Sequence, residues 1–166
     1  MRLAALAFAI LALVAAPLSA AELAHPQGDV VLTVTGDLAQ TNAEGRAQFD
    51  LAMLDALPQR TTVATTPWYT GEQSFSGVIV QDLLNAVGAK GTTATFVALN
   101  DYSADIPLED FAAMPIILAT RINGELLSVR DKGPLFVIYP FDLDPELHNE
   151  VTFSRSVWQV GEIKVH

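Results

Sequence analysis

The 166 residues include no cysteine, and they include few basic side chains. Without cysteine the chain has no disulfide bond, no thiolate nucleophile and no thiolate ligand for a metal. Only nine lysines and arginines stand against 19 aspartates and glutamates, so the formal net charge is −10. An acidic protein is repelled by phosphate backbones and by anionic lipid headgroups. We therefore expect no nucleic-acid partner.

Motifs of known catalytic and metal sites are also missing. The histidines, His25, His148 and His166, are far apart in the sequence, and none has a partner at the spacing of metal ligands. There is no nucleophile elbow, phosphate-binding loop or dinucleotide fingerprint. Asp142 and Asp144 resemble half of a calcium loop, but no closing glutamate follows at the required distance. This favours an exposed acidic turn at that position.

The N-terminus has the pattern of a secretory signal peptide. Arg2 provides a basic start, residues 3–16 are apolar, and small residues end the segment before cleavage after Ala20 or Ala21. The apolar run is shorter than the roughly 20 residues needed to span a bilayer, which disfavours the alternative of an uncleaved anchor. We expect residues 1–20 to be removed and the mature protein to be periplasmic, without direct membrane insertion.

Residues 21–166 are expected to form one domain. Apolar residues make up 51% of the chain, which is enough for a real core, and there are no repeats, linkers or low-complexity tracts. β-Branched and apolar runs predict strands at residues 30–35, 60–66, 94–99, 116–122, 135–139 and 157–165. Asp50 as an N-cap, together with proline and glycine as helix breakers, predicts short helices at residues 51–57, 79–87 and 107–113, with an irregular acidic segment at 141–150. Strands and short helices at uneven intervals indicate an α+β protein.

The most informative segment runs from Asn123 to Pro140. It begins with Asn123-Gly124, a strong two-residue hairpin turn. Three consecutive charges, at residues 130–132, then precede Gly133-Pro134 and the apolar strand at 135–139. A charged loop that leads into a core strand is a common way to present polar groups to a ligand. The alternative, which the residue types alone favour, is a solvated turn between two strands.

Several segments together resemble sulfite-oxidase-type molybdopterin-binding domains. NGELLSVRDKGPLFVIYP (123–140) is similar to the segment that lines the pterin site in that family, and RSVWQVGEIKV (155–165) to its closing strand. PWYTGEQSFSGVIVQDLL (67–84) and LNDYSADIPLEDF (99–111) extend the resemblance over residues 30–165. The resemblance implies an α+β fold of the sulfite-oxidase type, with mixed β-sheets and short helices in a single domain.

The sequence departs from this family where the metal would bind. In the catalytic members a cysteine ligates molybdenum on the loop after the strand that resembles residues 60–66. Here residues 65–68 read Thr-Thr-Pro-Trp, so no protein ligand for molybdenum is evident. The family's lysine beside the closing tryptophan is missing as well, since Val157 precedes Trp158. The missing cysteine counts against oxotransfer chemistry, and the missing lysine counts against binding of the full phosphorylated cofactor.

A pterin without metal still suits the residue types present. It is a flat bicycle with a donor-rich edge, which needs an aromatic or guanidinium face for stacking and oxygen acceptors along that edge. In our hypothesis Asp101 or Asp131 binds the edge, Trp68 or Tyr102 stacks, and Arg130 supplies donors. The predicted ligand-binding residues are Trp68, Tyr69, Asn100, Asp101, Tyr102, Arg130, Asp131, Lys132, Tyr139, Arg155 and Trp158.

Each of these candidates also has a purely structural interpretation. Trp158 is expected in the middle of a strand, where a core position is the more common outcome. Tyr139 fits the core or a pocket wall, and for Trp68 core and binding roles are equally favoured. Asp101 fits a turn cap, and Arg130 a surface ion pair with Asp131 or Asp105.

Three functions follow from the sequence. The resemblance, the missing cysteine and the signal peptide favour a non-catalytic periplasmic pterin sensor. Because the chain resembles the metal-free, pterin-binding members of the family, the resemblance implies as partner the periplasmic part of an inner-membrane signalling protein, a cyclic-di-GMP enzyme or a histidine kinase. The alternative is a molybdopterin-dependent oxidoreductase with a non-cysteine metal ligand. The third is a ligand-free docking domain, for which Trp68→Ala and Asp101→Ala leave partner signalling intact.

Overall fold

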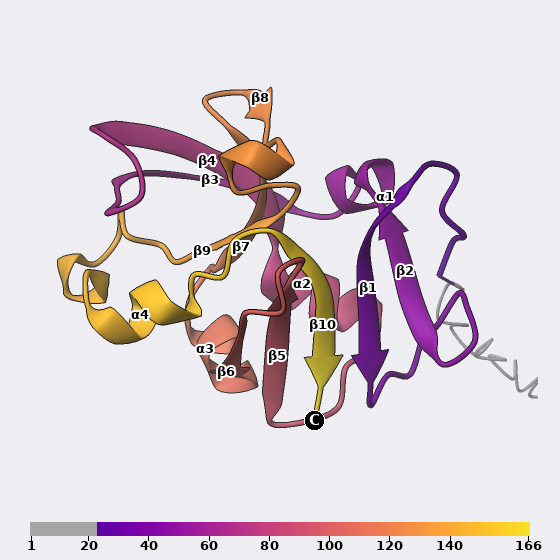
Figure 1. The fold of residues 1–166 in the computed structure, drawn as a ribbon. Helices are drawn as coiled ribbons and strands as arrows, with labels where there is room; N and C mark the ends of the chain where they lie inside the picture. The colour runs from indigo at the N-terminus through magenta and orange to yellow at the C-terminus, as the bar shows by residue number, and fades with distance from the viewer. Residues whose placement is uncertain (1–22) are drawn as a thin grey trace, which may run out of the picture.

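The structure is a computed structural model that describes residues 23–166. The predicted signal peptide at residues 1–20 lies outside this range. In the described part of the chain, ten strands form two five-stranded sheets, joined by short helices (Figure 1). None of the helices in residues 23–166 is long and apolar enough to cross a membrane.

The first sheet joins the two ends of the described chain. Its strand order is β2-β1-β10-β5-β6, with β1 parallel to β10 and every other neighbouring pair antiparallel. In β5, alternate residues Ala94, Phe96 and Ala98 are buried, as expected for a strand with one face on the core. The strands are β1 (Val30–Gly36), β2 (Arg46–Asp50), β5 (Thr93–Ala98), β6 (Ser103–Pro107) and β10 (Val160–Val165).

The second sheet is antiparallel and is built around β7. Its order is β3-β4-β7-β8, and β9 pairs with β7 as well. The hairpin between β7 and β8 turns at Asn123 and Gly124, whose φ angles of 51° and 85° are those that the sequence predicts for this dipeptide. The strands are β3 (Gln59–Thr65), β4 (Glu72–Ile79), β7 (Ile117–Ile122), β8 (Glu125–Leu126) and β9 (Phe136–Ile138).

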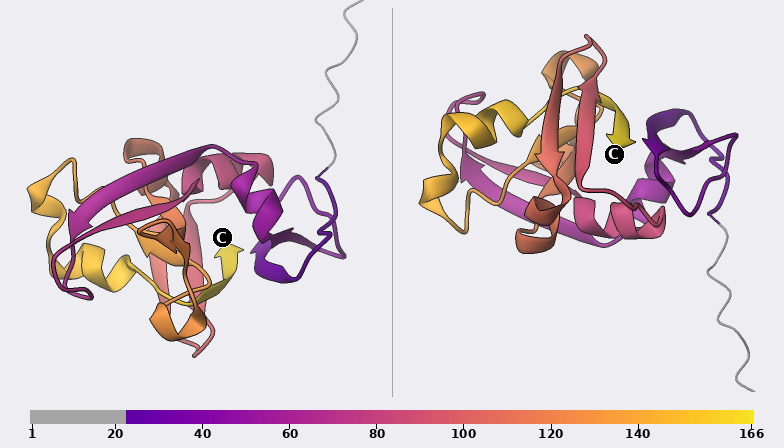
Figure 2. Two further views of the ribbon diagram at one scale, coloured as in Figure 1. Left: turned by 90° about the horizontal axis from the view of Figure 1, so that it is seen from above. Right: turned by 90° about the horizontal axis from the view of Figure 1, so that it is seen from below.

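Four short α-helices connect the strands. The carboxylate of Asp50 accepts a hydrogen bond from the Met53 amide at 2.9 Å and so caps the first of them, as predicted. In the views from above and below, the last helix lies at the opposite end of the molecule from β1 and β2 (Figure 2). The helices are α1 (Leu51–Asp55), α2 (Val80–Ala86), α3 (Leu108–Ala113) and α4 (Glu150–Arg155), with 3-10 turns at Val129–Asp131 and Pro145–Leu147.

One hydrophobic cluster draws residues from both sheets. Phe75 of β4 and Phe136 of β9 meet edge to face, with ring centroids 6.1 Å apart, and Phe96 of β5 contacts Phe111 of α3 at 5.7 Å. All four rings are buried. A single shared core confirms the prediction of one α+β domain.

Three segments differ from the predicted elements. Residues 72–79 form β4, which the sequence did not suggest. Residues 150–155 form α4, for most of which the sequence predicted no element, because the side chain of Asn149 caps the amides of Val151 and Thr152. The last strand begins at Val160 instead of residue 157, because Gln159 has a φ of 53° and ends the extended conformation before it.

Candidate functional site

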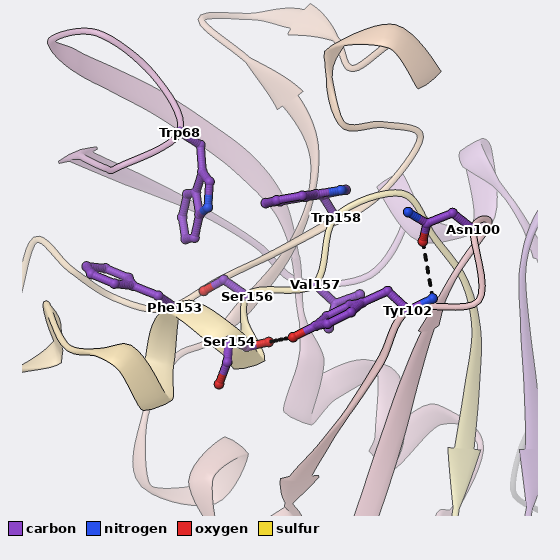
Figure 3. Close-up of a pocket in the computed structure, with 8 residues that line it drawn as sticks. All are labelled: Trp68, Asn100, Tyr102, Phe153, Ser154, Ser156, Val157 and Trp158. Atoms are coloured by element: carbon purple, nitrogen blue, oxygen red, sulfur yellow. Dashed lines mark hydrogen bonds between the residues drawn. The ribbon is translucent and has the colours of Figure 1, made fainter.

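A cavity of about 270 Å³ opens where three connections meet. These are the loop after β3, the β5–β6 turn, and α4 with the segment that leads into β10 (Figure 3). Its volume is close to the lower end of the roughly 300–1,000 Å³ of typical small-molecule sites. The lining residues are Trp68, Asn100, Tyr102, Phe153, Ser154, Ser156, Val157 and Trp158.

Aromatic rings form most of the cavity walls. Trp68 stands nearly perpendicular to Trp158, at 78° with centroids 6.3 Å apart, and to Phe153, at 80° and 5.7 Å. Trp68 also rests edge to face on the buried Phe136 at 5.1 Å. This contact with the core fixes one wall, whereas Trp158 remains 38% exposed at the rim.

Tyr102 reaches across the rim from the β5–β6 turn to α4. Its hydroxyl donates a hydrogen bond to the carbonyl of Ser154 at 2.8 Å. The turn places it there because Asp101 has a φ of 67° and the Asn100 side chain accepts from the Tyr102 amide at 3.2 Å. The ring of Tyr102 stays 48% exposed.

The polar lining groups of the cavity are mainly acceptors. The hydroxyls of Ser154 and Ser156 donate to main-chain carbonyls of α4, each at 2.8 Å, and Tyr102 donates to Ser154. Each hydroxyl proton is thus engaged, so these oxygens offer lone pairs to a ligand. The amide nitrogen of Asn100 is a donor, and none of the lining residues carries a charge.

Trp158 is positioned by main-chain hydrogen bonds of its neighbour. The Gln159 carbonyl accepts from the Leu99 amide at 2.9 Å, and the Gln159 amide donates to the Lys132 carbonyl at 2.9 Å. The Gln159 side chain donates to the Val129 carbonyl at 2.6 Å. These bonds tie the segment before β10 to the β5–β6 turn and to the charged loop.

The charged loop at residues 129–133 borders the aromatic wall. The Lys132 ammonium lies 4.6 Å from the ring centroid of Tyr69 and 5.9 Å from that of Trp158. The Tyr69 hydroxyl donates to the Asp131 carbonyl at 3.0 Å. Burial, and secondarily the Asp131 carboxylate, raises the pKa of Tyr69, so this hydroxyl stays protonated at neutral pH. The loop thereby holds Tyr69 and Trp158 together.

Other predicted residues lie outside the cavity lining. Arg130 and Asp101 are exposed, and in residues 23–166 Arg130 forms no ion pair, so the expected pairing with Asp131 or Asp105 is wrong. The Asp131 carboxylate instead accepts from the Ser128 hydroxyl at 2.7 Å.

Tyr139 and Arg155 lie outside the cavity lining and make contacts that support the fold. Tyr139 is fully buried, and its hydroxyl lies near the Asp110 and Arg155 side chains without a hydrogen bond of normal geometry to either. Burial raises the pKa of Tyr139 well above its usual value, and the nearby Asp110 carboxylate adds to this effect. Arg155 pairs with Asp110 at 2.8 Å and so connects α4 to α3. Of the two interpretations of Tyr139, the structure supports the core position.

The structure therefore brings together Trp68, Asn100, Tyr102 and Trp158. The expectation that Trp158 lies in a strand within the core is wrong, because the residue precedes β10 and is partly exposed. The sequence did not point to Phe153, Ser154 or Val157 as lining residues. Asn149, which caps α4, was the one local sequence signal that could have placed Phe153 and Ser154 on a helix beside the site.

A molybdenum ligand set is not evident near the cavity. Thr66, within the segment 65–68 where the resemblance places the metal-binding cysteine, is buried, and its hydroxyl has no partner. It is a single oxygen donor, and residues 23–166 hold no group of three histidine, cysteine or acidic side chains arranged for a metal. With no cysteine in the whole sequence, the donor set does not fit a metal held by the protein.

Comparisons with known proteins bear on the fold. The model of the oxidoreductase molybdopterin binding domain family matches residues 18–142. The fold is similar to the crystal structure of the sulfane dehydrogenase SoxCD from Paracoccus pantotrophus, with a TM-score of 0.63 and 19% sequence identity. That match covers 81% of this chain and 37% of the SoxCD chain, so the two share a fold over about a third of that chain. No curated protein matches the sequence.

Proposed function

We propose, since this chain belongs to the family of oxidoreductase molybdopterin-binding domains, that it binds a pterin without molybdenum and acts as a non-catalytic sensor. One observation carries the proposal. Trp68 and Trp158, the two tryptophans of the sequence, line one cavity whose hydroxyl oxygens are free to accept hydrogen bonds.

The pterin ring suits this cavity chemically. A flat heteroaromatic bicycle stacks on an indole face, and Trp158 presents one at the rim. The amino group and ring N–H of the pterin are donors, which complement the hydroxyl oxygens of Ser156 and Tyr102. The amide of Asn100 is a donor for the oxo group. A cavity of about 270 Å³ favours a ring system with a short substituent over a larger cofactor.

The metal and phosphate of the complete cofactor do not suit the same residues. No thiolate exists to ligate molybdenum, and no lining side chain carries the positive charge that a phosphate needs. The basic Lys132 is already engaged with the rings of Tyr69 and Trp158. The oxidoreductase alternative therefore gains no support from the donor set.

A sensor needs its ligand to alter a surface that a partner contacts. Tyr102 and Trp158 line the cavity and are also 48% and 38% exposed, so a bound ligand changes what this rim presents. The signal-peptide pattern at residues 1–20 supports a protein of the periplasm. The partner in this proposal is the periplasmic part of an inner-membrane signalling protein, a cyclic-di-GMP enzyme or a histidine kinase.

The test is to purify the exported protein under native conditions and analyse what it carries. After denaturation, chromatography with mass spectrometry detects released pterin, and elemental analysis measures molybdenum. We expect pterin without molybdenum. Stoichiometric molybdenum would overturn the proposal in favour of the oxidoreductase. If no pterin is released and added pterins do not raise the melting temperature, only the docking domain remains.

A further inference from the structure

We infer that the aromatic cavity recognises a positive charge, so that the class of ligand it takes is an organic ammonium cation or a ring with a protonated amino group. This inference uses the same cavity as the proposed function, but it does not require the ligand to be a pterin. It follows from the angles between the rings, from the chemistry of the polar lining groups and from a lysine ammonium that already lies against one of the cavity tryptophans.

The walls form a box. Trp68 is nearly perpendicular to both Trp158 and Phe153, at 78° and 80°. Tyr102 closes the box from the β5–β6 turn, and Figure 3 shows its ring across the cavity from Trp68. A flat ligand stacks on one such wall at a time, whereas a compact cation meets several ring faces at once. Multiple aromatic faces around a cation are the usual arrangement in proteins that bind quaternary ammonium groups.

The remaining lining groups also favour a cation. The hydroxyls of Tyr102 and Ser156 line the cavity and donate to carbonyls, so towards a ligand they act as acceptors. No basic side chain lines the cavity. The chain has a net charge of −10, which raises the concentration of cations near its surface.

The structure already places one cation against an aromatic side chain of the cavity, Trp158. The Lys132 ammonium lies 4.6 Å from the Tyr69 ring and 5.9 Å from the Trp158 ring. Because Trp158 contacts Lys132 and also lines the cavity, the lysine ammonium lies close to any bound ligand. It therefore repels a cationic ligand and attracts an anionic one. Removal of that charge therefore reports the sign of the charge that the cavity prefers.

The first test compares choline with its neutral isostere 3,3-dimethylbutan-1-ol. Both tryptophans line the cavity, so intrinsic fluorescence reports binding of either compound directly. We expect choline to bind at least about tenfold more tightly than the alcohol. Equal affinities, or no response to choline, overturn the inference. If a pterin binds and choline does not, this inference fails while the proposed function stands. If choline binds and no pterin does, the inference stands while the proposed function fails.

The second test uses variants. Tyr102 is half exposed, so its replacement does not threaten the core. Tyr102→Phe keeps the ring face and is expected to hold choline within about twofold, whereas Tyr102→Leu is expected to weaken it about threefold or more. Equal losses in both variants contradict recognition by the ring face. Lys132→Met is expected to raise the ratio of choline affinity to alcohol affinity, and a lower ratio overturns the preference for positive charge.

Discussion

The hydroxyl of Tyr102 donates to the carbonyl of Ser154 at 2.8 Å, across 52 residues of sequence. This bond joins the β5–β6 turn to α4 at the rim of the aromatic cavity. Both residues line the cavity, so the bond sets the distance between two of its walls.

Tyr102→Phe should loosen this rim with little effect on stability. An exposed hydrogen bond contributes about 0.5–1.5 kcal/mol, so we expect a fall in melting temperature of a few degrees at most. Amide hydrogen exchange should accelerate at residues 100–102 and in α4. Tyr69→Phe is the matched control, because it removes a hydroxyl-to-carbonyl bond at Asp131 outside the cavity lining. Equal acceleration in both variants would contradict a local role for Tyr102.

Trp158→Leu should weaken ligand binding strongly and stability weakly. Trp158 is 38% exposed but forms one cavity wall, so the lost aromatic face should lower pterin affinity about tenfold. Titration monitored through the remaining Trp68 measures this loss. Val129→Ala is the control, since Val129 is 52% exposed and does not line the cavity. Unchanged affinity in Trp158→Leu would place the pterin elsewhere.

Tyr139→Phe should be neutral or stabilising. A buried hydroxyl without a partner costs about 1–3 kcal/mol, and phenylalanine removes it while keeping the ring that packs against Phe141. Urea unfolding measures the change. Destabilisation by more than about 1 kcal/mol would show that the hydroxyl is satisfied in solution. Ligand affinity should not change, because Tyr139 lies outside the cavity lining.

Asp50→Asn should lower stability at neutral pH, and the loss should disappear in acid. The Asp50 carboxylate accepts from the amides of Gly28, Met53 and Gln27, which hold its pKa below the usual value. A lowered pKa in the folded state stabilises the protein above the unfolded-state pKa of about 4, and this contribution is lost as the pH falls through the folded value. Thermal unfolding at pH 7 and near pH 3 tests the prediction. A stability difference that is independent of pH would contradict it.

Asp55→Asn should have a small effect that depends on salt. Asp55 binds Arg121 through two hydrogen bonds of 2.7 and 2.8 Å, which join α1 to β7 and lower the pKa of Asp55. Both side chains are about a third exposed, so solvent screening limits the contribution to about 1 kcal/mol or less. Melting temperatures in low and high salt measure it. A loss that is the same at both salt concentrations would show a role in packing instead of charge.

Local features of the fold were predictable from the sequence. The Asn123-Gly124 turn, the Asp50 cap and the strand that became β1 depend on conformational preferences of neighbouring residues, and all three are confirmed. The predicted α+β fold of the sulfite-oxidase type is confirmed by the family match and by the similarity to SoxCD. The short α4 was missed, because six residues give too little periodicity to distinguish a helix from an acidic loop.

The candidate site was only partly predictable. The sequence singled out Trp68, Tyr102 and Trp158 by residue type and by resemblance. It placed Trp158 in a strand, because Val157 and Val160 suggest a continuous extended run. The positive φ of Gln159 interrupts that run and turns the indole to the rim. Lys132 was predicted to bind the ligand, and the structure shows its ammonium against the rings of Tyr69 and Trp158.

The sequence by itself determined the chemistry that this protein lacks and the local shape of its turns and caps. The absence of cysteine removes thiolate chemistry in any fold, and the acidic composition sets the charge in any conformation. Only the tertiary structure decided which aromatic side chains share a cavity. Trp68, Tyr102 and Trp158 meet because β10 inserts between β1 and β5 and carries the preceding segment to the β5–β6 turn. Strand pairing between distant segments depends on the packing of the whole core, which no local pattern of residues encodes.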